Sequence, residues 1–458
     1  MLNLASLTFA LLATSSALAV GTPFGFASET TGGNSAAQAV PTSAAQLKSW
    51  LEDNVTRNIL LDRTYDFTDT EGTVTEKGCR PWKCSPNPQL SLNGNGWCGS
   101  NPLNETVTYK KAGTSGIRVK SNKTILGKGT SGWIKGKGLL LSGVSNVIIQ
   151  NIRISDINPQ YVWGGDALYI DNSSKVWVDH NYFKSVGRQF IVTGFGAAKQ
   201  VTISNNYIDG QSTYSTGCDQ HHYWALLFAG NGDQITFAQN YVYFTAGRGP
   251  HVGGMDGYSL TLHMYNNYFN DVAGHAIDAD TGSKILVEGN YFNKASLTVR
   301  TPSTGNAKGA VFAPTSASMN SQCNTSLGRN CVSNTLAGGS GTLANTANSG
   351  ILGSFTDSVV KSASIRNPAD VVAAKPQVWF GYHHHPIGVC VFIRPNIDDL
   401  KFIQMSNHNT KRPHSPSPHD STPPAKRRAH SPEEGEVEST SPSTRPTTEP
   451  PTRTRAGS

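Results

Sequence analysis

A short pattern recurs along the middle of the chain: a run of β-branched or aliphatic residues that ends in asparagine and then an aromatic or aliphatic residue. It appears as VIIQNIRI, VWVDHNYF, VTISNNYI, ITFAQNYV, LHMYNNYF and ILVEGNYF, with the asparagines at Asn151, Asn181, Asn206, Asn240, Asn267 and Asn290. The intervals are 30, 25, 34, 27 and 23 residues. Such self-similarity is typical of solenoids, in which each unit buries its apolar face only by stacking on its neighbours.

The composition of the repeats indicates the type of solenoid. The runs are short, are separated by Gly and Asn, and lack helical periodicity, so each unit should be a β-coil. Asparagine suits a coil corner because it tolerates the left-handed backbone conformation and its amide can bond the same residue one coil away. We therefore predict an all-β, right-handed parallel β-helix, a single-stranded solenoid. A β-sandwich, the alternative, would require turn signals about every 8 to 12 residues.

The remaining segments divide around this solenoid. Residues 1–19 have the apolar run and the small-residue ending Ala17-Leu18-Ala19 of a signal peptide, so we expect a secreted, extracellular protein. Residues 20–374 should form the β-helix domain. Its first part, to about residue 110, is expected to be a capping region with a helix near residues 44–54. The small, polar residues 301–367 are expected to lie along the solenoid rather than inside it.

Residues 375–458 differ in texture from everything before them. They are rich in Pro, Ser, Thr and mixed charge, which is typical of disorder, and their KRPH and AKRR clusters fit a solvated tail better than a nuclear-localisation signal. A divergent exon or a gene-model error would also account for this segment. The run His383-His384-His385 is interpreted as an adventitious metal binder at most.

Charge and cysteine usage exclude several classes of partner. The formal net charge is +7 over 458 residues, without a basic stripe interleaved with aromatics, so we expect no nucleic acid partner. No later apolar run reaches about 18 residues, so we expect no membrane span. The seven cysteines lack the CxxC pairs of a zinc site, which argues against a metal, and in a secreted chain they indicate disulfides. Glycosylation sequons occur at Asn54, Asn104, Asn122, Asn172 and Asn324.

At GTSGWIKGKG, YVWGGDALYIDN, VWVDHNYF, GRQF, CDQHHYW and AGRGPHV the chain closely resembles the fungal pectin lyases, members of the polysaccharide lyase family that also contains the pectate lyases. The resemblance covers about residues 21–373. It implies β-elimination in methyl-esterified pectin: a base removes the C5 proton beside the ester, and the C4 glycosidic oxygen leaves. It also implies that the enzyme needs no calcium or other cofactor, and we expect a monomer.

The resemblance implies catalytic roles for three residues. Arg248 in GRGP matches the catalytic arginine, Asp166 in WGGD the carboxylate, and Arg188 in VGRQ a second guanidinium that would act where calcium acts in pectate lyases. Because guanidinium groups are treated as permanently protonated, Arg248 is assigned the position of the base with its protonation mechanism left open. Alternatively it orients hydroxide or stabilises the enolate. Outside these motifs, such residues would be turn formers or surface residues.

Aromatic residues should hold a neutral ester polymer, because ring faces suit it better than charges do. By motif the lining residues are Trp82, Trp97, Trp163, Tyr223 and Trp224, although tryptophan is also a large core residue. His251 replaces a lysine that many relatives have three residues after the catalytic arginine. We expect it to contact substrate and to tune substrate or pH preference.

Several pairings complete the expectations. Asp179 and His180 suggest an acid–base pair, but a role in supporting the repeat corner is favoured. His221 and His222 either line the site or pack in the core or on the surface. The resemblance implies disulfides Cys79–Cys98, Cys84–Cys218 and Cys323–Cys331, with Cys390 left unpaired. Two functional alternatives stay open: a calcium-dependent pectate lyase, and a non-catalytic carbohydrate-binding β-solenoid.

Overall fold

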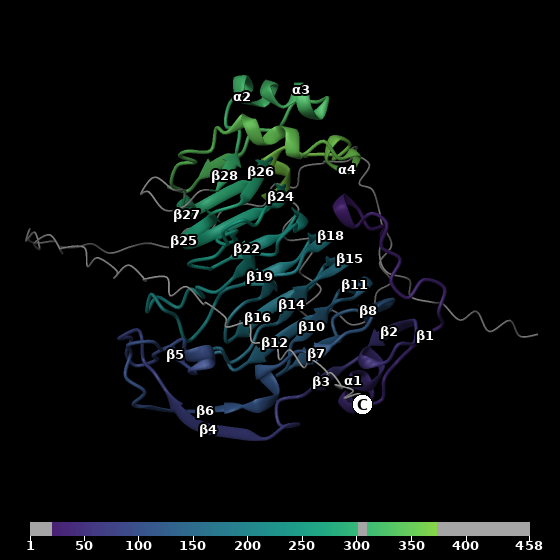
Figure 1. Ribbon diagram of the computed structural model, residues 1–458, viewed down its shortest axis with the longest axis vertical. Coiled ribbons are helices and arrows are strands. Elements are labelled where there is room, and N and C mark those ends of the chain that lie inside the picture. The colour runs from purple at the N-terminus through teal and green to yellow at the C-terminus, as the bar shows by residue number, and fades with distance from the viewer. Residues whose placement is uncertain (1–20, 301–308, 373–458) are drawn as a thin grey trace, which may run out of the picture. The chain divides into compact units, whose positions relative to one another are not determined.

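The computed structural model describes residues 21–300 and 309–372, without the side chains of residues 296–300. In this part the chain winds into stacked β-coils (Figure 1). The right-handed parallel β-helix predicted from the repeats is therefore confirmed. No helix in these ranges is long and apolar enough to cross a membrane. The expected signal peptide, the segment 375–458, His383 to His385 and Cys390 lie outside the described residues.

Two parallel sheets contain most of the strands. The first sheet runs, in spatial order, through β1 (Gln38–Ala39), β2 (Arg57–Leu61), β8 (Lys123–Gly127), β11 (Ser145–Gln150), β15 (Ser173–Asp179), β18 (Ala198–Ser204), β21 (Gln234–Ala238), β24 (Leu260–Tyr265), β26 (Ser283–Glu288) and β28 (Ala310–Phe312). Equivalent residues of successive coils lie side by side, as in the row Val147, Val176, Val201, Ile235, Leu262 and Ile285.

The second sheet forms two faces that the long strand β25 (Tyr268–Ala279) joins. One face contains β3 (Thr64–Asp66), β9 (Trp133–Lys135), β12 (Arg153–Ile157), β16 (Tyr182–Val186), β19 (Tyr207–Asp209) and β22 (Tyr241–Tyr243). The other contains β23 (His251–Val252), β20 (Leu226–Phe228), β17 (Ile191–Thr193), β14 (Leu168–Asp171), β10 (Leu139–Ser142) and β7 (Ile117–Arg118). Strands β27 (Tyr291–Arg300) and β29 (Thr335–Ala337) extend this sheet beyond β25.

The core lies between these faces and follows from the alternation along each strand. In β14, Leu168 and Ile170 point inward and are 0% exposed, whereas Tyr169 and Asp171 point outward. The inward rows of all coils merge into one hydrophobic cluster. Burial of each such aliphatic side chain contributes roughly 1.5–3 kcal/mol, and no coil could gain this without its neighbours.

Buried asparagines form a ladder at the corner between the first sheet and the β12–β22 face. The side chains of Asn181, Asn206, Asn240, Asn267, Asn290 and Asn334 are linked, Nδ2 to Oδ1, at 2.9–3.0 Å. Each Oδ1 also accepts a backbone N–H from the preceding coil, as Asn240 does from Asn206 at 3.0 Å. The predicted bonding of asparagine from coil to coil is thus confirmed for five of the repeats.

The structure corrects one detail of this prediction. The left-handed conformation and the bond from coil to coil, both expected of one asparagine, belong to two adjacent residues of each corner. The left-handed residue is the one before the ladder, with φ of 54° at His180 and 52° at Asn205. Asn151, with φ of 55°, belongs to that preceding position. Ile152 takes its place in the ladder, and its backbone N–H donates to Asn181 Oδ1 at 3.1 Å.

The N-terminal region begins the solenoid but does more than cap it. Helix α1 (Ala44–Glu52) follows the N-cap Ser43, whose hydroxyl accepts from Gln46 N, and it buries Leu47 and Leu51 in the core. The antiparallel hairpin β4 (Thr73–Gly78) and β6 (Glu105–Lys110) projects sideways from the coils (Figure 1). Between them, β5 (Leu90–Ser91) pairs with β13 (Tyr161–Val162), so the cysteine-rich loop lies along the side of the solenoid.

The C-terminal part corrects the expectation for residues 301–367. Strands β28 and β29 and the ladder residue Asn334 continue the coils, so part of this segment lies inside the solenoid. Helices α2 (Ala317–Gln322) and α3 (Asn324–Leu327) lie beyond β28, whereas α4 (Ser358–Lys361) lies at the side of the coils against residues 25–27 (Figure 1). The last described residues also run alongside the coils, where Val371 packs with Tyr241 and Tyr268.

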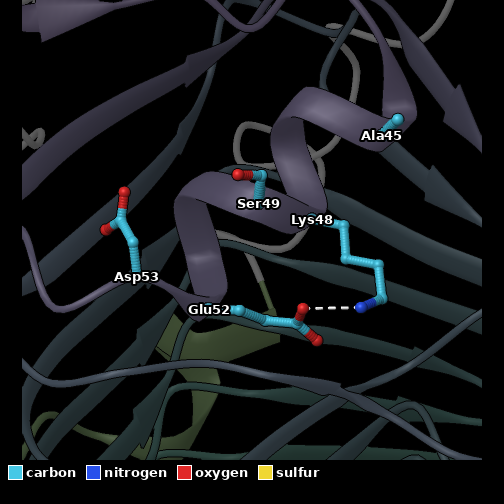
Figure 2. Close-up of a pocket in the computed structure, with 5 residues that line it drawn as sticks. All are labelled: Ala45, Lys48, Ser49, Glu52 and Asp53. Atoms are coloured by element: carbon cyan, nitrogen blue, oxygen red, sulfur yellow. Dashed lines mark hydrogen bonds and ion pairs between the residues drawn. The ribbon is translucent and has the colours of Figure 1, made fainter.

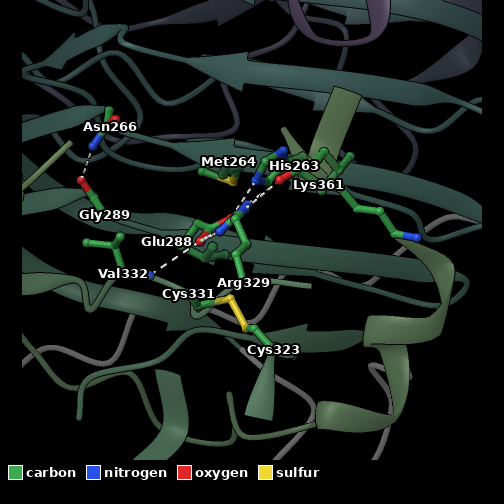
Figure 3. A network of polar contacts seen from close by, with 12 residues as sticks. His263, Met264, Asn266, Glu288, Gly289, Cys323, Arg329, Cys331, Val332 and Lys361 are labelled. Carbon is green, nitrogen blue, oxygen red and sulfur yellow. Dashed lines mark hydrogen bonds and ion pairs between the residues drawn. A yellow bond between two sulfur atoms is a disulfide. The ribbon is translucent and has the colours of Figure 1, made fainter. Parts of the chain in front are cut away.

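A buried charge network fixes this end of the solenoid (Figure 3). Glu288, 0% exposed, accepts from Arg329 at 2.7 and 2.9 Å and contacts His263 Nε2 at 2.8 Å. Burial acts to raise the pKa of Glu288, but Arg329 and His263 outweigh it and lower the pKa to about 2. Arg329 lies in the short loop that the Cys323–Cys331 disulfide closes. The disulfide, as the resemblance implied, therefore holds the arginine that neutralises Glu288.

Replacing Asn240 by alanine should destabilise the solenoid. The change leaves the backbone N–H and one amide hydrogen of Asn206 without an acceptor, and Asn267 Oδ1 loses one of its two donors, at a cost of about 3 kcal/mol. The denaturation midpoint in urea should fall accordingly. Asn87→Ala, at an exposed asparagine, is the matched control and should leave the midpoint unchanged. Equal midpoints for both variants would contradict a stabilising ladder.

Candidate active site

The three expected catalytic residues share one corner of the solenoid, the one between the two faces of the second sheet. Asp166 lies between β12 and β14, Arg188 between β16 and β17, and Arg248 between β22 and β23. Strands β14, β17, β20 and β23 are consecutive neighbours in the sheet. The loops that precede these strands are therefore stacked as well, and segments about 80 residues apart in sequence reach the same side of the molecule.

Asp166 and Arg188 form a bidentate ion pair. Arg188 Nε lies 3.0 Å from Asp166 Oδ1, and Nη2 lies 2.7 Å from Oδ2. Both side chains are largely buried, at 15% and 16% exposed. Burial alone would lower the pKa of Arg188, but the Asp166 carboxylate raises it above its ordinary value. Arg188 thus carries a permanent, oriented positive charge, as a paired fork geometry favours.

Local backbone constraints explain the sequence around this pair. Gly165, just before Asp166, has φ of 140°, and a Cβ there would lie 2.0 Å from Gly113 O. No other residue fits this close approach. Trp163 covers the pair, with its ring centroid 4.0 Å from Arg188 Cζ, a cation–π contact.

Arg248 lies two coils beyond Arg188 on the same corner. Its Cζ is 4.8 Å from the centroid of the Trp224 ring. Its backbone has φ of 50°, the left-handed region that non-glycine residues rarely adopt, and its carbonyl accepts Leu226 N at 2.7 Å. Because the same conformation recurs at other corners of this solenoid, as at His180 and Asn205, it reflects the geometry of the coil.

The cysteine-rich loop brings an aromatic wall to this corner. Trp82, Trp97 and Trp224 lie with centroids 5.9–6.2 Å apart, and Tyr223 contacts Trp224 at 5.0 Å. The disulfides are paired as the resemblance implied: Cys79–Cys98 closes this loop on itself, and Cys84–Cys218 ties it to the segment between β19 and β20. Trp224 is only 3% exposed, whereas the rings of Trp82, Trp97, Trp163 and Tyr223 are partly exposed.

The histidines of this region divide into three situations. His222 is buried and neutral: burial lowers its pKa to about 4, and its Nε2 lies 2.7 Å from Arg188 O and 3.1 Å from Trp224 O. His221 stacks on Phe244 at 3.6 Å. His251, on β23, points outward and its Nδ1 lies 2.8 Å from Asp278 Oδ2.

Asp179, the last residue of β15, and His180, which follows it, lie at a different corner, where the chain passes from β15 to β16. Asp179 is 1% exposed and accepts from Gln150, Ser204 and Asn205, at 2.7–2.9 Å. This carboxylate ties three coils together, which agrees with the favoured supporting role. The side chains of all five sequon residues, Asn54, Asn104, Asn122, Asn172 and Asn324, are exposed. Their glycosylation stays a prediction.

Two other features bear on the site. The pocket beside α1, lined by Ala45, Lys48, Ser49, Glu52 and Asp53, contains an internal Lys48–Glu52 ion pair and no aromatic residue (Figure 2). It lies away from the charged corner. Sequence reasoning missed Gln189 and Asp278, which contact Asp166 and His251. The only available signal was the position of Gln189 directly after Arg188.

Fold and site together define a polysaccharide lyase of the parallel β-helix class, and comparisons agree. The chain matches the pectate lyase family over residues 99–364. It is 47% identical over 334 residues to pectin lyase D of Aspergillus niger, which covers 72% of this chain and 87% of that protein. It is 44% identical over 363 residues to pectin lyase B of Emericella nidulans, covering 78% and 93%.

Among solved structures, a pectate lyase bound to a hexasaccharide matches with a TM-score of 0.50 at 20% identity, covering 79% of this chain and 97% of that one. That likeness concerns the fold alone. The sequence matches go further, and the chain belongs to the pectate lyase family.

The buried His222 should make stability depend on pH. Its folded pKa of about 4 lies below the unfolded value of about 6.5, so the unfolded chain binds a proton that the folded chain refuses. The stabilisation is complete above pH 6.5, and about 3 kcal/mol is lost as pH falls to 4. The measurement compares melting temperatures of the wild type and His222→Gln at pH 7 and pH 4.5. The melting temperature of the wild type should fall further between pH 7 and pH 4.5 than that of His222→Gln.

The comparison with the variant is needed because buried Asp233 has the opposite effect on how stability changes with pH. Burial raises its pKa to about 7, so its contribution falls as pH rises toward 7. Parallel pH curves for the wild type and His222→Gln would refute the assignment of His222 as a buried neutral group.

Proposed function

We propose that the protein is a secreted pectin lyase that cleaves methyl-esterified homogalacturonan by β-elimination, without calcium. The observation that carries this proposal is the buried Asp166–Arg188 pair, which sets a fixed cation on the corner that also holds Arg248. The extracellular location rests on the signal-peptide pattern of residues 1–19. We also propose that it acts as a monomer.

The reaction needs positive charge where the ester carbonyl gains enolate character, and a base at C5. Arg248 takes the position of the base. The C5–H bond breaks, its electrons form the C4–C5 double bond, and the C4–O bond breaks as the glycosidic oxygen leaves and takes up a proton. Arg188 suits the carbonyl because Nε and Nη2 are bound to Asp166, whereas Nη1 has no acceptor among the described residues.

The carboxylate of Asp166 is poorly suited to bind calcium here. Oδ1 accepts from Arg188 and from Gln189 N, and Oδ2 accepts from Arg188. Calcium prefers six to eight oxygen ligands, several of them carboxylates. In the described part of the chain, no group of three or more His, Cys, Asp or Glu residues is arranged to hold a metal. These features support a mechanism in which Arg188 supplies the charge.

The surroundings of the pair also favour an uncharged polymer. The accessible rings of Trp82, Trp97 and Trp163 offer apolar faces, which bind sugar rings through stacking. Polygalacturonate, which carries a charge on each residue, would instead be met mainly by lysine and arginine side chains. His251, paired with Asp278, is proposed to contact the substrate beside Arg248.

An assay of the unsaturated product tests the proposal directly. Ultraviolet absorbance should rise quickly with highly methylated pectin and slowly with polygalacturonate, and a chelator should change neither rate. A faster, chelator-sensitive reaction on polygalacturonate would identify a calcium-dependent pectate lyase. Binding of pectin without product, unaltered in Arg248→Ala, would identify a carbohydrate-binding solenoid.

Removing the fixed cation should impair the reaction itself. Arg188→Met retains a chain that can cover Trp163 but leaves Asp166 with an uncompensated negative charge beside the substrate. We expect kcat on methylated pectin to fall by about 10² to 10³, the usual loss for one stabilising donor. Arg63→Ala, at an exposed arginine, is the control and should keep full activity. Wild-type kcat in Arg188→Met would exclude a role for this charge.

A further inference from the structure

Gln189 contacts both halves of the charged site. It is 0% exposed and follows Arg188 directly. Its backbone N–H donates to Asp166 Oδ1 at 2.8 Å, and its carbonyl accepts Ala167 N at 2.9 Å. These two main-chain bonds fix the residue to the coil that carries Asp166. Its side chain is directed the other way along the solenoid, toward the coils of Trp224 and Arg248.

The side-chain amide has one orientation that satisfies both of its ends. In that orientation Oε1 accepts from Arg248 Nη1 at 3.1 Å, and Nε2 donates to Trp224 O at 3.3 Å. The reverse orientation would set the NH₂ group against the guanidinium and the oxygen against a carbonyl. Because a buried amide without partners costs about 1–3 kcal/mol per group, the first orientation is the one that the site selects.

From this geometry we propose that Gln189 is a positioning residue, which orients Arg248 through a neutral acceptor and couples it to the Asp166–Arg188 pair. One residue thereby sets the spacing between the fixed cation and the arginine in the base position. The Trp224 ring holds the same guanidinium from its face. The inference rests on the proposed function only for the reaction that Arg248 performs, whereas the contact itself is independent of substrate.

The neutrality of the amide matters for Arg248. A carboxylate at this position would form a stronger, charge-assisted bond, but it would also stabilise the protonated guanidinium. The Asp166 carboxylate is already bound in bidentate fashion to Arg188. An amide fixes the direction of Arg248 without adding a negative charge beside it. It therefore orients the side chain and opposes the loss of a proton from the guanidinium less than a carboxylate would.

Gln189→Glu and Gln189→Met test the proposal on methylated pectin, with kcat and KM measured across pH. In Gln189→Glu the new charge should lower kcat about tenfold at the wild-type optimum and move the midpoint of the pH profile upward by about one unit, with KM nearly unchanged. Gln189→Met keeps the volume but loses both bonds, so kcat should fall about 10- to 100-fold with the midpoint unmoved. Gln234→Glu, on β21 of the other sheet, is the matched control for the added charge.

A double-mutant cycle on thermal unfolding tests the contact without reference to activity. If Gln189 binds Arg248, the melting temperature of Gln189→Met/Arg248→Met should fall by less than the sum of the single losses. Additive losses, or a Gln189→Glu enzyme whose pH midpoint and kcat match those of Gln234→Glu, would overturn the proposal. Should the wild type leave methylated pectin uncleaved, the proposed function fails, and the cycle alone then decides the contact.

Discussion

Everything in this structure depends on coils that repeat in register, and the buried asparagine ladder enforces that register. From Asn206 onward, each ladder oxygen accepts the backbone N–H and the side-chain amide of the preceding ladder residue, as Asn240 does from Asn206. A shift by one residue would break two bonds per coil inside the protein, where no water replaces them. The inward rows of Val, Ile and Leu then stack in phase, so hydrophobic burial and polar bonding require the same alignment.

The site is a consequence of this stacking. Asp166, in the loop before β14, is far from Arg248 in sequence. The order β14–β17–β20–β23 in the sheet nevertheless brings the loops of both residues to one corner. The coils supply the charges, and the disulfide-bonded loop between β4 and β6 supplies the rings of Trp82 and Trp97. Rigid strands thus define the distance between cations, while an insertion held by covalent bonds provides the aromatic wall.

The sequence predicted the parts of the molecule that repeat. The repeats of Asn and aromatic residues were sufficient for the β-helix, because the period of the pattern equals the length of a coil. They were insufficient for Asn334, which lacks the hydrophobic run, and for the exchange of roles at Asn151 and Ile152, because adjacent corner positions look alike in sequence. The C-terminal coils were missed because their strands also lack the repeated hydrophobic run: β28 and β29 are short and are separated by helices.

The candidate site was predictable as a set of residues but not as an arrangement. Motifs indicated Asp166, Arg188 and Arg248, whereas the side-chain bonds of Gln189 and the burial of Trp224 depend on which coils are neighbours, and no local pattern records that. The pairing of Asp278 with His251 likewise follows from the β23–β25 register.

On the proposed function, the form of the cation also has a consequence for substrate choice. A calcium ion brings two charges and needs several carboxylates, so it suits a substrate that supplies some of them. Arg188 brings one charge, which is paired with the carboxylate of Asp166, and offers only Nη1 to a substrate. Its planar guanidinium, pinned by two bonds and the Trp163 ring, can donate to a neutral carbonyl in one direction only. The fold therefore holds this cation in place before the substrate binds. A neutral ester carbonyl can accept a hydrogen bond from it without bringing a further negative charge into the site.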